Sequence, residues 1–102
     1  MNITPFTIDI PQAQLDDLYN RLRNTNWPHD YANDDWQYGT NTAYMRELVD
    51  YWVNEHDWRA AEAEMNQHRH FRTKIDGMPI HFIHQKGQGP NPTPLILSHG
   101  WP

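Results

Sequence analysis

Hydrophobic residues recur with a helical period near the start of the chain. Between residues 11 and 24 they stand at offsets of zero, three, four and seven, as Leu15, Leu18, Tyr19 and Leu22. Polar residues, among them Asp16, Asp17 and Arg21, occupy the other sides. This pattern predicts an amphipathic helix. Pro11 fits the first helical position, where its missing N–H costs nothing.

Two further helices are predicted before residue 67. Thr40 or Asn41 can cap the first of them, whose stripe consists of Met45, Leu48, Val49, Trp52 and His56. Asp57 can cap a shorter one that contains Trp58, Ala61 and Met65. Residues 27–40 show no period, and we expect an irregular segment packed through its aromatic side chains, which are Trp27, Tyr31, Trp36 and Tyr38. A ligand shelf is the less favoured interpretation of these aromatic residues.

Beyond residue 68 the period changes to that of strands. Residues 71–75 and 78–84 read as a β-hairpin joined by the two-residue turn Asp76-Gly77. After a loop rich in Gly and Pro, the apolar run 94–98 predicts a strand buried on both faces. This order predicts a helical meander over residues 1–67 and the first strands of a larger core over residues 68–102. Chemistry in open α/β sheets sits beyond the C-terminal ends of strands, where this chain carries His99-Gly100-Trp101-Pro102.

Composition narrows the class of protein. A chain of 102 residues can bury only a thin core. Its net charge is −5, with scattered basic residues, which argues against nucleic acid as a partner. The lack of cysteine excludes disulfides, thiolate metal ligands and cysteine nucleophiles. We find no signal peptide and no apolar run of membrane-spanning length, and we therefore expect a cytoplasmic protein with no membrane partner.

Two groups of polar residues could be given a chemical role. The histidines His68, His70, His81 and His84 could hold a metal, with the first two on one face of a strand. However, His81 and His84 point to opposite faces and no carboxylate completes a set, so we favour structural histidines and expect no metal and no cofactor. The adjacent acidic pairs at 16–17 and 34–35 diverge in direction, which favours solvated faces and turn caps over acid–base catalysis.

The terminal tetrapeptide, following a strand of the Leu-Ile-Leu type, resembles the oxyanion-hole turn of microsomal-type epoxide hydrolases. The resemblance extends back over nearly the whole chain, through Phe71-Arg72-Thr73, Ile75-Asp76-Gly77, Ile80-His81-Phe82-Ile83-His84, Asp57-Trp58-Arg59, Leu48-Val49-Asp50-Tyr51-Trp52, Trp36-x-Tyr38-Gly39-Thr40 and Pro5-Phe6. It implies an α+β fragment of an α/β-hydrolase, with a meander of two to three helices, a β-hairpin and one further strand.

The resemblance also implies a two-step reaction. An Asp opens the epoxide to give an ester, and water activated by a His with an acidic partner hydrolyses that ester, while two lid Tyr hydroxyls assist ring opening. The backbone N–H of Trp101 would then stabilise the oxyanion. Gly100 would allow close backbone approach and Pro102 would fix the turn, while His99 would hold the turn by hydrogen bonds rather than transfer protons.

The catalytic side chains of that reaction are not present in this sequence. Its one serine, Ser98, lies outside any Gly-x-Ser-x-Gly elbow, and no Gly-x-Asp-x-x-Gly elbow occurs. We therefore expect the N-terminal part of an epoxide hydrolase, truncated after the oxyanion turn and inactive alone. The alternative is a non-catalytic binding or dimerisation module derived from the family.

The expected partners follow from the same resemblance. An epoxide would bind only in the complete enzyme. In the family's sheet a later strand lies between the hairpin and the strand at residues 94–98, so both would expose unpaired edges. The chain is therefore expected to bind the missing catalytic portion, to self-associate, or to leave its last ten residues poorly ordered.

Overall fold

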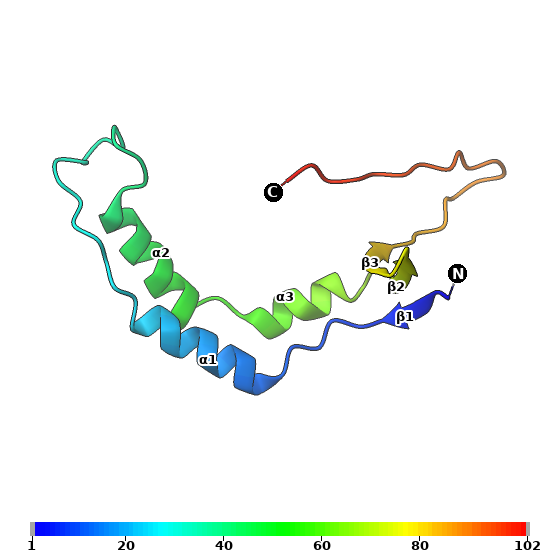
Figure 1. Cartoon of the computed structure of the whole chain (residues 1–102), viewed down its shortest axis with the longest axis horizontal. Helices are drawn as coiled ribbons and strands as arrows, with labels where there is room; N and C mark the ends of the chain where they lie inside the picture. Colours follow the sequence, from blue (N-terminus) through cyan, green and yellow to red (C-terminus); the bar gives the residue numbers. More distant parts are fainter. Residues whose placement is uncertain (1, 102) are drawn as a thin grey trace. The chain divides into compact units, whose positions relative to one another are not determined.

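A computed structural model describes residues 2–101. Its elements, in order, are β1 (Thr4–Phe6), α1 (Gln12–Arg23), α2 (Thr42–Asn54), α3 (Trp58–Met65), β2 (His70–Ile75) and β3 (Met78–Ile83), as Figure 1 shows. They form two compact units. One is Ile8–Ala63, and the other combines the described residues before Ile8 with those from Glu64 onward. Three helices with a three-stranded antiparallel sheet confirm the α+β class, while the domain boundary after residue 67 stays a prediction.

In α1 the residues of the predicted apolar stripe are the ones that are shielded from solvent. Leu15 is 5% exposed, and the other three residues of the stripe are half-buried. Pro11 precedes the helix as its N-cap residue instead of occupying its first turn. Its carbonyl accepts the N–H of Gln14 at 2.9 Å. The missing N–H of proline has no cost at either position.

Side-chain caps begin α2 and α3. The Asn41 side chain accepts the backbone N–H of Tyr44 at 2.9 Å, so Asn41, not Thr40, is the cap of α2. The N–H of Thr42 donates to the Asp30 carboxylate at 2.7 Å, which lowers the pKa of Asp30. The Asp57 carboxylate accepts the N–H of Ala60 at 3.1 Å, which confirms the predicted cap of α3.

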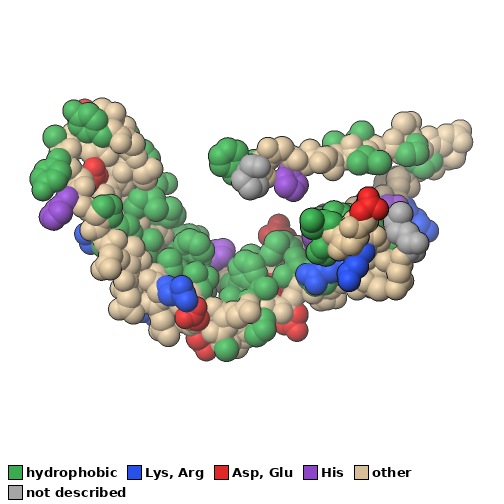
Figure 2. Space-filling view, in the orientation of Figure 1, with side chains coloured by type: hydrophobic (Ala, Val, Ile, Leu, Met, Phe, Trp, Pro, Cys, Tyr) green, Lys and Arg blue, Asp and Glu red, His purple; other side chains and the backbone are tan. Residues whose placement is uncertain are grey.

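The predicted stripe of α2 is partly wrong. Leu48 and Trp52 are 39% and 40% exposed, while Met45, Val49 and Val53 are half-buried. Residues four apart lie above one another on a helix, so these half-buried residues form one narrow row on α2, which packs on α1. Figure 2 shows hydrophobic side chains left on the surface over α2.

The segment between α1 and α2 is organised by a polar side chain. Asn33 is only 3% exposed. Its Nδ2 donates to the carbonyl of Gly39 at 3.2 Å, and its Oδ1 accepts the N–H of Tyr38 at 3.0 Å. The expected anchoring by aromatic packing is only partly confirmed. The ring of Trp36 lies 5.1 Å from that of Tyr44 in α2, but Tyr31 stacks only on His29 within the same segment, and Tyr31 and Tyr38 are 79% and 76% exposed. One side-chain amide, which has both donors and an acceptor, can hold a short loop together by hydrogen bonds to its backbone. Large aromatic rings become buried only where other residues cover both of their faces.

The β-hairpin forms as predicted. β2 and β3 pair antiparallel from His70 opposite Ile83 to Ile75 opposite Met78. Asp76 and Gly77 both adopt positive φ, +49° and +81°, which is the backbone of a type I′ turn. The sequence did not predict β1, which pairs with the other side of β2 and gives the order β1-β2-β3.

The predicted strand at residues 94–98 is absent from the structure. Leu95, Ile96 and Leu97 are 79%, 91% and 85% exposed. No described residue pairs with this segment. A strand exists only through hydrogen bonds to a neighbouring strand, so an apolar run without a partner does not become one. Among residues 2–101, no helix is both long and apolar enough to cross a bilayer.

Candidate oxyanion turn

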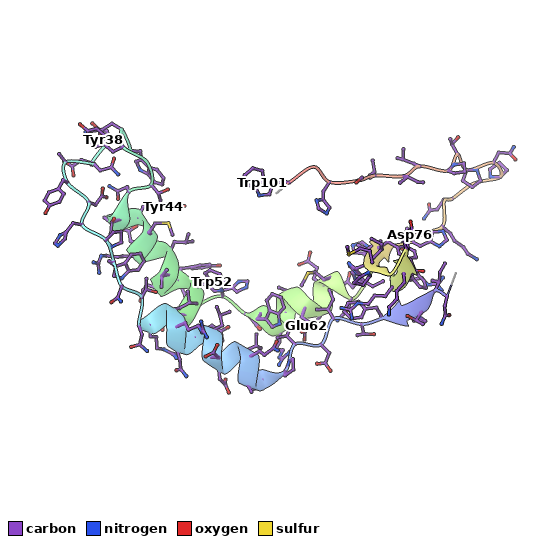
Figure 3. The ribbon with its side chains drawn as sticks, in the orientation of Figure 1. Tyr38, Tyr44, Trp52, Glu62, Asp76 and Trp101 are labelled. Carbon is purple, nitrogen blue, oxygen red and sulfur yellow. The ribbon has the colours of Figure 1, made fainter. Side chains whose placement is uncertain are left out.

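The residues of the terminal turn contact one another. The Nδ1 atom of His99 lies 2.7 Å from the carbonyl oxygen of Trp101. Because a carbonyl only accepts, this contact requires the proton on Nδ1. The hydroxyl of Ser98 donates to the carbonyl of His99 at 3.4 Å. Trp101 is 86% exposed and is labelled on the terminal segment in Figure 3. Pro102 lies outside the described residues.

This geometry suits a turn that presents a backbone donor. The imidazole of His99 holds the Trp101 carbonyl, and no described residue accepts the Trp101 N–H. An added Cβ at Gly100 would meet nothing within 4 Å, so that side of the backbone is open to an approaching group. The assignment of His99, Gly100, Trp101 and Pro102 to an oxyanion hole stays a prediction.

The histidines lie in a different arrangement from a metal site. His70 is 6% exposed. Its Nδ1 lies 3.0 Å from Nε2 of His81, and its Nε2 lies 2.7 Å from the carbonyl of Met65. The two rings are within 12° of parallel. His68 precedes β2, so the prediction that His68 and His70 share a strand face is wrong. No group of three or more potential ligands occurs within residues 2–101.

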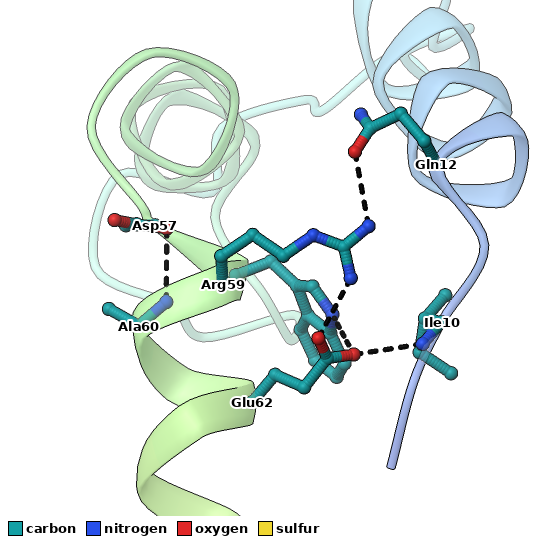
Figure 4. A network of polar contacts seen from close by, with 7 residues as sticks. Ile10, Gln12, Asp57, Arg59, Ala60 and Glu62 are labelled. Carbon is teal, nitrogen blue, oxygen red and sulfur yellow. Dashed lines mark hydrogen bonds and ion pairs between the residues drawn. The ribbon is translucent and has the colours of Figure 1, made fainter.

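A polar network surrounds Glu62, a residue that sequence reasoning did not single out. Glu62 is 8% exposed. Its carboxylate accepts from the backbone N–H of Ile10 at 2.9 Å, the indole of Trp58 at 3.1 Å and the guanidinium of Arg59 at 2.8 Å (Figure 4). These donors, led by the Ile10 N–H, lower the pKa of Glu62 against the effect of burial. The network ties the chain before α1 to α3, which is a structural role.

The adjacent acidic residues are solvated, as predicted. Asp17 pairs with Arg21 at 2.8 Å, with both side chains largely exposed. Asp16 accepts from the Gln12 amide at 2.9 Å. Asp34 and Asp35 lie exposed in the segment before α2. None of these carboxylates faces its neighbour in the way that shared-proton catalysis requires.

A helical meander, a β-hairpin and a terminal turn together define the class of protein. The sequence profile described as "Epoxide hydrolase N terminus" matches residues 3–102. The chain therefore belongs to the epoxide hydrolase N-terminal family, which confirms the resemblance. A Stigmatella aurantiaca protein, whose name gives epoxide hydrolase as an inferred activity, is 45% identical over 98% of this chain. Epoxide hydrolase 1 of Oryctolagus cuniculus is 35% identical over 99%.

Solved structures show the same fold. The Aspergillus niger epoxide hydrolase matches 81% of this chain with a TM-score of 0.74 and 35% identity. The juvenile hormone epoxide hydrolase of Bombyx mori matches 87% with a TM-score of 0.79 and 26% identity. The chain spans about 23% of the length of the two curated relatives above. It corresponds to the N-terminal portion of α/β-hydrolase epoxide hydrolases.

Proposed function

We propose that this chain supplies the oxyanion turn and the helical scaffold of an enzyme that hydrolyses epoxides to vicinal diols. The observation that carries the proposal is the turn itself, in which His99 holds the Trp101 carbonyl and the Trp101 N–H has no acceptor among the described residues. Membership of the family supports the choice of reaction.

In the proposed reaction an Asp carboxylate attacks one epoxide carbon while the bond from that carbon to the ring oxygen breaks. The ring oxygen takes a proton from a lid hydroxyl, and the product is an alcohol joined to the Asp as an ester. Water, deprotonated by a His, then adds to the ester carbonyl. The resulting oxyanion accepts the N–H of Trp101. When it collapses, the bond from the Asp carbonyl carbon to the alcohol oxygen breaks, the leaving alkoxide takes the proton held by the His to give the diol, and the carboxyl proton returns to the lid oxygen, which restores the Asp carboxylate.

The Asp, the His and the lid hydroxyls do not come from this chain in the proposal. The isolated chain is therefore expected to be inactive. What this chain contributes is one hydrogen-bond donor whose position is set by Gly100 and His99. Loss of one such donor in an oxyanion hole typically lowers kcat by about 100- to 1,000-fold.

A chimera tests this role. The matching N-terminal region of the Aspergillus niger epoxide hydrolase is replaced by this chain, and hydrolysis of styrene oxide is measured. We expect turnover from the chimera and none from the chain alone. Trp101→Pro, which removes the backbone N–H, should lower kcat by about 100-fold or more, while Trp101→Phe, which keeps the N–H, should retain most of it. Turnover by the chain alone, or equal kcat values for the two variants, would overturn the proposal.

A further inference from the structure

Two histidines on one face of the sheet share a hydrogen bond. His70 lies in β2 and His81 in β3, and Nδ1 of His70 is 3.0 Å from Nε2 of His81. The ring centres are 5.1 Å apart and the ring planes differ by 12°. Because the nitrogens are so much closer than the ring centres, the rings meet end to end in nearly one plane. This places the lone pair of one nitrogen in line with the N–H of the other.

A second contact of His70 fixes where the protons lie. Its Nε2 is 2.7 Å from the carbonyl oxygen of Met65, the last residue of α3. A carbonyl only accepts, so this nitrogen carries a proton. In a neutral His70 ring the other nitrogen, Nδ1, is then bare and accepts the N–H of His81. The two contacts join the end of α3, β2 and β3 within the sheet unit.

The pair can take up one further proton without losing its hydrogen bond. If His81 is charged, its Nε2–H still donates to the bare Nδ1 of His70. If His70 is charged, its Nδ1–H donates instead, and His81 accepts on Nε2 while keeping a proton on its other nitrogen. A second further proton would place N–H groups on both facing nitrogens, 3.0 Å apart. Neither could then accept, and the contact would have to open.

The groups around the pair carry positive charge or no charge. They are the Met65 carbonyl of α3, Phe6 of β1, Arg72 of β2 and, in the segment before β2, His68 and Arg69. Arg72 stands opposite His81 in the ladder, and its guanidinium lies 3.6 Å from the centre of the Phe6 ring. Within residues 2–101, no carboxylate forms a hydrogen bond or ion pair with either ring. Two charged rings would therefore repel both each other and Arg72.

We propose that His70 and His81 form a pH-sensitive clamp. It holds the hairpin to the end of α3 while the pair is neutral or carries one charge, and it opens when both rings become charged. His70 is 6% exposed, and every contact of the clamp is made between residues of the sheet unit. The proposal therefore rests on contacts that are present, and it does not depend on the hydrolytic role.

The direction of the pH effect follows from the number of protons bound. In the unfolded chain the two histidines take up protons independently, each at about pH 6.5. While the clamp is closed, the folded pair takes up only one. The unfolded chain thus binds more protons in acid, so the ratio of folded to unfolded sheet is retained above this range and falls below it. Between pH 6.5 and pH 5 the expected loss is about tenfold.

His81→Gln tests the clamp, because a glutamine amide can donate to or accept from Nδ1 of His70 and never becomes charged. Hydrogen exchange of β2 amides, corrected for the intrinsic rate at each pH, measures opening of the sheet. In the unaltered chain we expect about tenfold more opening at pH 5 than at pH 6.5, and in His81→Gln no such increase. An equal increase in both proteins would overturn the proposal.

His84→Gln is the matched control. His84 follows β3, and its ring lies near that of Phe71 instead of in the pair. The control removes one histidine in the folded and the unfolded chain alike, so it should keep the full acid effect. Loss of that effect in His84→Gln would assign it to the wrong histidine and would contradict the clamp.

Nitrogen-15 NMR of the imidazole rings gives a second measurement, on the unaltered chain, that does not require any variant to fold. At pH 8 both His70 and His81 should carry their proton on Nε2. At pH 5 the two rings of the folded chain should together carry one positive charge. Two charges or none on this pair would overturn the proposal.

Discussion

Glu62 accepts three hydrogen bonds within the helical unit. Two donors, the Ile10 N–H and the Trp58 indole, reach one carboxylate oxygen, and Arg59 reaches the other. Three donors around one group need an acceptor with lone pairs on both oxygens, which is an ionised carboxylate. A protonated carboxyl group or an amide at this position would point its own O–H or N–H at one of these donors and lose that hydrogen bond. Charge, and not only shape, is therefore what this position requires.

Glu62→Gln should lower the stability of the helical unit near neutral pH by several degrees in melting midpoint. Because folding lowers the pKa of Glu62, the unfolded chain binds its proton first on acidification. The stabilisation is thus present above the ordinary Glu range, about pH 4.3, and is lost as the pH falls through the lower pKa of the folded state. The unaltered chain should lose more stability than the variant between about pH 5 and pH 3, as measured by thermal melts followed by CD.

Glu64→Gln is the matched control, because Glu64 lies exposed in the same helix. Its melting midpoint should follow that of the unaltered chain at every pH. Parallel curves for Glu62→Gln and the unaltered chain across the acidic range would show that the Glu62 charge does not stabilise the fold.

Whether a residue's role was visible in the sequence depended on how far away its partners lie. Asp57 caps a helix through an N–H three residues on, and such a local relation was predicted. Glu62 binds the N–H of Ile10, 52 positions away, which no local pattern encodes. One signal was available: Trp58 and Arg59 precede Glu62 by four and three residues, so all three share one helix side. Asn33 carried no such signal, since its segment has no period.

At the scale of elements, the sequence left two candidates for the N-cap residue of α2, Thr40 and Asn41, and the structure selects Asn41. Asn41→Ala removes the acceptor of the Tyr44 N–H and should lower the free energy of unfolding by about 1 kcal/mol, the typical value for a lost N-cap. Thr40→Ala should change it by less than about 0.5 kcal/mol. Urea denaturation followed by far-UV CD measures both. The reverse order of the two losses would assign the cap to Thr40.

Strands were predictable where pairing is local. The hairpin joins neighbours in sequence, and its Asp-Gly turn fixes the register. β1 pairs with residues nearly seventy positions on, with Thr4 opposite Arg72, and contains a proline, so neither period nor composition indicated it. Residues 94–98 were the opposite case, because a strand was predicted and none is present. Their composition is that of a buried strand, but no described strand pairs with them. The terminal motif indicated the family, whereas the oxyanion role proposed for its turn involves groups that the motif does not contain.

The whole molecule is divided into two units with very different internal connections. Leu15 in α1 is the one buried hydrophobic side chain among residues 2–101, and α1 packs on α2 in the helical unit. The sheet unit is held by a continuous ladder between β2 and β3, extended by β1. A unit with so little buried apolar area gains little from the hydrophobic effect. Each unit is therefore expected to open by itself instead of in one cooperative step.

Unfolding in urea should accordingly show two transitions. The tryptophans Trp27, Trp36, Trp52 and Trp58 all lie in the unit Ile8–Ala63, so their fluorescence reports on the helical unit, while hydrogen exchange at β2 amides reports on the sheet. We expect the two midpoints to differ, because the packing of α1 on α2 holds the helical unit whereas a hydrogen-bonded ladder holds the sheet unit. Trp101→Phe removes the one tryptophan outside that unit and should leave the fluorescence midpoint unchanged. Coincident midpoints in this variant would mean that the two units unfold together, as a single cooperative structure.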